Sequence, residues 1–216
     1  MHTNKTEFSN FITGVYQRNK SILIISVAIF FIPFFLGILM GYFLPGLTEY
    51  LLTEYVKLIQ SLPLEMTTSY IFTHNLGAAL LTYIGGVIGI IPVGTLSFNG
   101  FFIGSFIGYL TRGSILSSFG TLSATEFIAY TLPHAIFEIP GFIISGAAGF
   151  RVTTLVIGII RSMKNKTPIN EHYWKFKDSL ILLLIAIILL FIAAFIEANL
   201  TIPIGNSITG LNLHYS

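Results

Sequence analysis

Two things are scarce in this 216-residue sequence, namely thiol groups and charge. No cysteine is present, which excludes disulfide bonds, thiol catalysis and thiolate metal ligands. Charged residues make up only 9% of the chain and apolar residues 54%, whereas soluble domains carry roughly 25% charged residues. The net charge of +2, without a basic cluster among aromatic residues, argues against a nucleic-acid partner. The composition predicts an integral membrane protein.

Catalytic signatures are missing as well. The chain contains no H-E-x-x-H zinc helix, no G-x-S-x-G nucleophile elbow and no G-x-x-x-x-G-K-[ST] phosphate loop. The loops between the apolar runs are too short for a soluble catalytic domain. We therefore expect a protein that is not an enzyme, with no catalytic residue, cofactor or metal site. The alternative is an intramembrane metallohydrolase, in which His74 would join His134 and Glu138 as a third zinc ligand.

Several apolar runs have about the 20 residues that a helix needs to cross a bilayer. They predict an all-α, polytopic transmembrane helical bundle with one transmembrane domain over residues 21–200. Residues 1–20 are expected to form a cytoplasmic interfacial segment, and residues 201–216 a polar C-terminal tail. A further amphipathic helix over 49–62 is expected to lie in the interface plane. The expected spans cover residues 21–44, 71–91, 95–110, 140–160 and 179–197, with a tight turn at 92–94.

Residues 126–161 are too long for a single crossing. As one helix they would measure about 54 Å at ~1.5 Å per residue, against a hydrocarbon core of ~30 Å. Pro133 and Pro140 each remove a helical hydrogen bond, so we expect a broken helix. Residues 126–139 would form a re-entrant or interfacial piece before the crossing at 140–160. This interpretation has five spans, and the alternative has six.

Lysine and arginine are concentrated in two segments, which sets the expected orientation. The N-terminal segment holds Lys5, Arg18 and Lys20, and the 161–178 loop holds Arg161, Lys164, Lys166, Lys175 and Lys177. Cytoplasmic loops carry an excess of these cations, so both segments are expected on the cytoplasmic side of the cell membrane. With five spans, the C-terminus is then extracellular.

Small residues recur at four-residue intervals along the apolar segments. The expected helix-packing glycines are Gly85 and Gly89, then Gly100, Gly104 and Gly108, and finally Gly141 and Gly149 on either side of Ser145. This spacing lets helix backbones approach one another closely in lipid. We expect packing within one subunit, with homodimerisation through the same residues as the alternative.

Two ionisable residues, His134 and Glu138, lie one helical turn apart in an apolar stretch. Placing a charge at bilayer depth costs about 2.5–3.5 kcal/mol or more, so such residues tend to be paired and functional. Two interpretations stay open: a site for an ion, a proton or a head group, and a structural hydrogen bond between helices. The candidate intramembrane polar site also includes His74, Asn75, Asn99 and Arg151. Arg151 would reach Glu138 only if the helix breaks near Pro140.

Four short motifs follow one another along the chain. They are His74-Asn75-Leu76-Gly77, Asn99-Gly100-Phe101-Phe102-Ile103-Gly104, Leu132-Pro133-His134-Ala135-Ile136-Phe137-Glu138 and Ser145-Gly146-Ala147-Ala148-Gly149. In this order they resemble the stage II sporulation protein M family of integral membrane proteins. In endospore-forming bacteria that family resembles a scaffold that gathers cell-wall hydrolases at the septal membrane. The resemblance implies a non-enzymatic membrane scaffold whose partners are membrane lipid and other membrane or cell-envelope proteins.

A transport function is the alternative to the scaffold. Segments interrupted by glycine and proline mark binding sites in transporters. Residues 71–110 and 126–150 are interrupted in this way. The chain would then be a permease-type subunit for a lipid or another membrane-derived substrate. Its basic 161–178 loop would dock a cytoplasmic ATPase.

Overall fold

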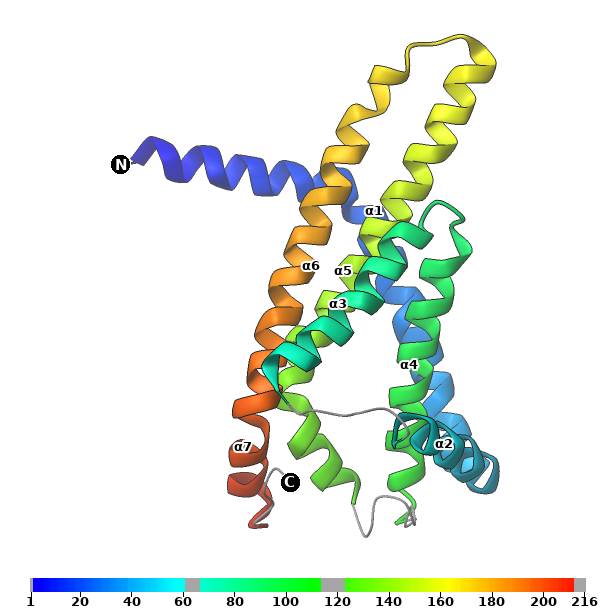
Figure 1. Cartoon of the computed structure of the whole chain (residues 1–216), viewed down its shortest axis with the longest axis vertical. Coiled ribbons are helices and arrows are strands. Elements are labelled where there is room, and N and C mark those ends of the chain that lie inside the picture. Colours follow the sequence, from blue (N-terminus) through cyan, green and yellow to red (C-terminus); the bar gives the residue numbers. More distant parts are fainter. Residues whose placement is uncertain (1, 61–66, 114–122, 212–216) are drawn as a thin grey trace.

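The computed structural model describes residues 2–60, 67–113 and 123–211, and all regular structure in these residues is helical. The helices are α1 (His2–Phe43), α2 (Pro45–Gln60), α3 (Thr68–Gly85), α4 (Ile90–Leu110), α5 (Ala124–Asn165), the short 3-10 helix η1 (Ile169–His172), α6 (Tyr173–Asn199) and α7 (Thr201–Thr209). Figure 1 shows α1, α3, α4, α5 and α6 gathered into one elongated bundle. The all-α architecture predicted from the sequence is confirmed for the described residues.

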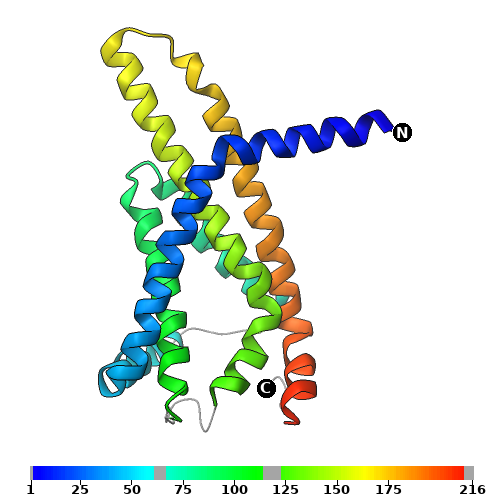
Figure 2. The ribbon, with the colours of Figure 1, turned by 180° about the vertical axis from the view of Figure 1, so that it is seen from behind.

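Helix α1 changes direction between its two halves. Its C-terminal half runs along the bundle, whereas its N-terminal part projects sideways, as the two opposite views in Figures 1 and 2 show. Phe11, Ile12 and Tyr16 on this projecting part are exposed. Exposed aromatic and aliphatic residues on a helix that leaves the bundle at a steep angle are typical of a helix in a membrane interface. The direction of this part of α1 and its exposed residues are compatible with the interfacial role expected for residues 1–20, which stays a prediction.

The turn between α3 and α4 lies earlier in the chain than expected. It consists of residues 86–89, and Gly89 has a φ of 79°, a conformation that residues with a Cβ rarely adopt. Pro92 lies instead inside the first turn of α4 and is buried. Proline is tolerated there because the first helical N–H groups have no intrahelical acceptor. The turn predicted at 92–94 is therefore wrong.

Helix α5 is continuous, so the predicted break and re-entrant piece over 126–139 are wrong. It extends for 42 residues and contains both Pro133 and Pro140. A capping box between Ser123 and Glu126 starts it, and further along, α6 packs closely against it because Gly141 lies against the Leu190 side chain. Figure 2 shows α5 bending in its lower, green part while it remains one helix. Packing against neighbours offsets the hydrogen bonds that the two prolines remove.

Helix α5 is longer than the bundle, and its C-terminal part extends beyond the other helices. The C-terminal part of α5, η1 and the start of α6 form a helical hairpin that projects beyond the other helices (Figure 1). We call residues 152–177 the hairpin arm. It lies at the end of the molecule where α1 bends away, whereas the C-terminus lies at the opposite end (Figures 1 and 2). The two basic segments identified in the sequence are therefore on the same side of the bundle.

Four helical stretches among the described residues are long and apolar enough to cross a membrane, rather than five. They are Asn10–Phe43, Ile90–Leu110, Ala124–Asn165 and Ile169–Asn199. The difference is α3, whose 18 residues are long enough to cross but include polar residues such as His74 and Asn75 that lower its hydropathy. Helix α3 nevertheless runs antiparallel to α6, because Asn199 donates to the Thr68 hydroxyl and Tyr83 lies 3.2 Å from the Ser179 hydroxyl. The chain is a multi-pass membrane protein, and its orientation stays a prediction.

Glycines bring α1 and α4 into backbone contact. A Cβ atom on Gly100, Gly104 or Gly108 would collide with the backbone carbonyls of Phe30, Phe34 and Ile38 in α1, and one on Gly37 or Gly41 with α4. The remaining predicted glycines have different neighbours. Gly85 lies against the Ile91 side chain, Gly89 against Thr153, Gly141 against Leu190, and Gly149 against Thr82 and Pro92. All these contacts are within one subunit.

Candidate functional site

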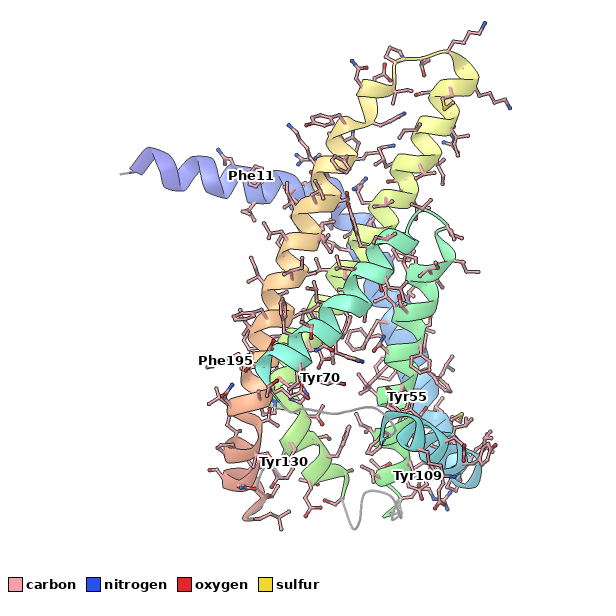
Figure 3. All side chains as sticks on the ribbon, viewed as in Figure 1. Phe11, Tyr55, Tyr70, Tyr109, Tyr130 and Phe195 are labelled. Atoms are coloured by element: carbon pink, nitrogen blue, oxygen red, sulfur yellow. The ribbon has the colours of Figure 1, made fainter. Side chains whose placement is uncertain are left out.

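His134 and Glu138 lie on the same face of α5, with 3.8 Å between His134 Nε2 and Glu138 Oε2. Their side chains are only 12% and 24% exposed. Glu197, in the last turn of α6, joins them, and one ligand atom from each of the three residues lies within 4.8 Å of the others. Figure 3 labels Tyr130 and Phe195, which lie close to this cluster in the sequence on α5 and α6. The polar pair predicted from the sequence is therefore part of a three-residue cluster.

Thr201, the first residue of α7, orients the imidazole of His134. Its Oγ1 lies 3.1 Å from His134 Nδ1 and donates to the Ile196 carbonyl oxygen at 3.3 Å. The direction of the contact between Nδ1 and Oγ1 depends on the imidazole tautomer. In the tautomer with its proton on Nδ1, this nitrogen donates to Oγ1. The other ring nitrogen, Nε2, then carries a lone pair. We call His134, Glu138, Glu197 and Thr201 the His134 cluster.

Tyr130 docks α7 onto α5 beside the His134 cluster. Its hydroxyl donates to Asn206 Oδ1 at 2.7 Å and lies 3.1 Å from Thr209 Oγ1. Gly205 lets α7 approach, because a Cβ there would collide with the Tyr130 ring. Since Thr201 lies on α7, the Tyr130 contacts also hold the partner of His134 Nδ1 in position.

The substitution Tyr130→Phe is therefore expected to loosen α7. Losing a neutral hydrogen bond costs about 0.5–1.5 kcal/mol, which corresponds to amide exchange in α7 that is about twofold to tenfold faster. Hydrogen–deuterium exchange on the purified protein in detergent measures this effect. Tyr16→Phe, at an exposed tyrosine on α1, is the control. Equal exchange in α7 for both variants would contradict the docking role.

The other residues of the predicted polar site lie elsewhere. His74 is exposed on α3, and Asn75 is buried on the same helix. Asn99 donates to the Thr95 carbonyl of its own helix. Arg151 does not pair with Glu138, because α5 is unbroken between them. The structure therefore brings together only His134 and Glu138 from the predicted set, and it adds Glu197 and Thr201.

Arg151 belongs to a second polar group, which joins α1, α5 and α6. Arg18 donates to both oxygens of Asp178 at 2.9 and 2.7 Å, and Asn19 donates to Asp178 Oδ2 at 2.9 Å. Arg151 in turn donates to Asn19 Oδ1 at 2.7 Å and to the Arg18 carbonyl at 2.6 Å. Asp178 is 1% exposed and Arg151 5%. We call these four residues the anchor cluster, since they lie at the base of the hairpin arm.

Sequence reasoning missed the anchor cluster, although one signal was available. Asp178 directly precedes the apolar run that starts at residue 179, so its carboxylate had to be exposed or paired. Its cationic partner lies 160 residues earlier in the chain, and no local pattern connects the two. Glu197 was missed as a member of the His134 cluster for the same reason.

Known proteins match this chain over most of its length. The model of the family described as stage II sporulation protein M matches residues 26–202. The chain is 33% identical over 181 residues to the uncharacterized protein MJ0793 of Methanocaldococcus jannaschii, covering 83% of this chain and 93% of the relative. It is 30% identical over 135 residues to the uncharacterized protein MJ0706 of the same organism, covering 62% of this chain and 56% of that relative.

No solved structure matches the chain. The family match, in contrast, covers the whole His134 cluster and two of the four anchor-cluster residues, Arg151 and Asp178. The chain belongs to the stage II sporulation protein M family.

Proposed function

We propose that this protein is a non-enzymatic membrane scaffold that holds partner proteins at the membrane through its hairpin arm. One observation carries the proposal: a basic helical hairpin projects beyond the bundle (Figure 1). Arg161, Lys164, Lys166 and Lys177 on it are exposed. A projecting pair of helices presents side chains to a partner without disturbing the membrane-embedded packing. Membership in the stage II sporulation protein M family supports this function.

Contacts between its two sides give the hairpin arm a defined shape. Lys175 Nζ donates to the Thr154 carbonyl oxygen at 3.2 Å, and His172 Nε2 lies 3.0 Å from the Ser162 hydroxyl. Lys166, with a φ of 55°, ends α5 in the left-handed conformation that is common after a helix C-terminus. The anchor cluster then fixes the base of the arm to α1. A preorganised arm of this kind pays less entropy on binding than a disordered loop would.

The surface of the hairpin arm indicates the chemistry of the partner. Its exposed cations alternate with exposed apolar side chains, namely Ile160, Met163 and Ile169. Between its two sides lies a cavity of about 510 Å³ lined by polar residues that include Arg161, Ser162 and His172. Cations set around apolar contacts fit a partner face that carries carboxylates around an apolar patch.

Purification of partners from native membranes tests the scaffold. We expect mild crosslinking and affinity purification of the tagged protein to recover membrane or envelope proteins, identified by mass spectrometry. Charge reversal at both Lys164 and Lys166 is expected to reduce recovery about tenfold, because each exposed ion pair contributes roughly 0.2–1 kcal/mol and reversal adds repulsion. Lys57→Glu, at an exposed lysine of α2, is the matched control. Unchanged recovery from the double variant would contradict a role for the hairpin arm.

A second candidate function is the permease-type subunit, and the His134 cluster favours it. Ionisable residues inside the membrane-spanning part of a protein often mark a substrate or ion pathway. The same purification separates the two functions. A cytoplasmic ATPase recovered in stoichiometric amounts would replace the scaffold with the transporter subunit, whereas septal or wall-modifying proteins without an ATPase would support the scaffold.

A further inference from the structure

We infer that His134, Glu138 and Glu197 bind a divalent transition-metal ion at the end of the bundle where α5, α6 and α7 meet. The inference concerns a site that the scaffold does not require, so it stands apart from the proposed function. Three side chains converge from two helices, with ligand atoms within 4.8 Å of one another. One imidazole nitrogen and two carboxylates form a donor set that zinc, manganese and ferrous iron accept.

One tautomer of His134 is suited to metal binding. With the proton on Nδ1, His134 donates to Oγ1 of Thr201, whose own proton goes to the Ile196 carbonyl oxygen. This contact leaves the Nε2 lone pair directed toward the side where Glu138 lies. A hydrogen bond from the second ring nitrogen to a neighbouring oxygen is the usual support for a metal-binding histidine, because it sets both the tautomer and the ring orientation.

The distance between the two α5 residues also fits ligands of a shared cation. At 3.8 Å, Nε2 and Glu138 Oε2 are farther apart than the roughly 2.7–3.2 Å of a hydrogen bond. Two ligand atoms that each lie about 2.0–2.2 Å from one zinc ion are separated by roughly 3.3–4.0 Å when they subtend about 109–130° at the metal. The 3.8 Å between Nε2 and Oε2 therefore matches the separation of two ligand atoms on one metal ion.

The negative charge of the two carboxylates also favours a bound cation. The cluster gathers two carboxylates, from Glu138 and Glu197, in a part of the molecule where both side chains are partly buried. Carboxylates that share a site repel one another or compete for protons unless a cation lies between them. Three protein ligands leave a fourth position open, as in zinc sites that hold a water molecule or a substrate group. The residual exposure of His134 and Glu138 provides access for the ion.

Metal analysis of the full-length protein tests the inference. The protein is purified in detergent with a tag that contains no histidine, stripped with a chelator and dialysed against Zn²⁺ or Mn²⁺. We expect about one ion per chain by mass spectrometry of the elements, and an affinity at least about 100-fold weaker in Glu138→Gln and Glu197→Gln. His74→Ala, which removes an exposed histidine outside the cluster, is expected to bind like the parent protein.

Two outcomes would overturn the inference. The first is less than about 0.1 ion per chain in the parent protein, which would mean that the cluster binds protons and no metal ion. The second is equal binding in the parent and in both glutamine variants, which would indicate an adventitious ion only. If the variants fail to fold, X-ray absorption of the zinc-loaded parent protein decides. We expect one imidazole nitrogen and carboxylate oxygens at about 2.0–2.2 Å, and a shell of water oxygens without imidazole would reject the site.

Discussion

Replacing Gly104 with leucine is expected to prevent the bundle from folding, whereas the same change at Gly94 is expected to leave it folded. A Cβ on Gly104 would collide with the Phe34 carbonyl oxygen, a backbone atom that no rotamer change can move. Around Gly94, in the same helix, no atom lies within 4 Å of the added Cβ. Separating α1 from α4 would also disrupt the neighbouring contacts of Gly100 and Gly108, so we expect a loss greater than the usual ~1–3 kcal/mol of overpacking.

Size-exclusion chromatography and thermal melting in detergent measure this difference. Gly104→Leu is expected to give an aggregated or unfolded protein, and Gly94→Leu a monodisperse peak that melts near the parent temperature. Gly94→Ala is expected to stabilise the helix by about 0.5–1 kcal/mol, because alanine loses less backbone entropy than glycine. If Gly104→Leu melted like Gly94→Leu, the close packing of α1 on α4 would be contradicted.

The second large effect is expected at Asp178, in the anchor cluster. Its buried carboxylate accepts hydrogen bonds from Arg18 and Asn19, and Asn19 in turn accepts one from Arg151. Asp178→Ala leaves the largely buried guanidinium of Arg151 without a nearby carboxylate. Removing one member of a fully buried ion pair costs about 3–5 kcal/mol, and the 44% exposure of the Arg18 side chain lowers the cost expected here. We therefore expect this variant to lower the melting temperature strongly and to expose the hairpin arm to proteases.

Glu54→Ala is the matched control for Asp178→Ala. Glu54 pairs with Lys57 on the exposed side of α2, at 2.8 Å. Exposed pairs on a helix contribute only about 0.3–0.5 kcal/mol, so its melting temperature is expected to stay close to that of the parent. Similar melting of both variants would show that Asp178 does not hold α1, α5 and α6 together.

The effect of proline on the helices was predicted incorrectly from local rules, because tertiary packing overrides them in this chain. Pro133 and Pro140 predict a break in α5 when each is considered alone, since each removes one backbone hydrogen bond. The structure keeps α5 continuous, because α6 packs against it through Gly141. In α3 and α4 the error was smaller. The turn was assigned to Pro92 instead of Gly89, although only the glycine has a positive φ.

Some residues of the candidate site could be recognised from the sequence, and others only from the packing of the helices. His134 and Glu138 are recognisable from their spacing of four residues, which places them on one helical face. Glu197 and Thr201 are more than 55 residues later in the chain, and their role depends on how α6 and α7 pack on α5. The pairing of Arg151 with Asn19 depends on contact between α1 and α5. No periodicity within a helix encodes which residues of different helices meet.

Composition and hydropathy alone were sufficient to establish a helical membrane protein, because apolar segments about 20 residues long have few other stable states. The C-terminal ends of α1, α4 and α6 followed from the same local pattern to within two residues, whereas all three helices start earlier than the expected spans. Helix packing decided the rest: the continuous α5, the projecting hairpin arm and the members of both polar clusters. These features depend on contacts between residues far apart in sequence, whose free energies arise only after the helices have come together.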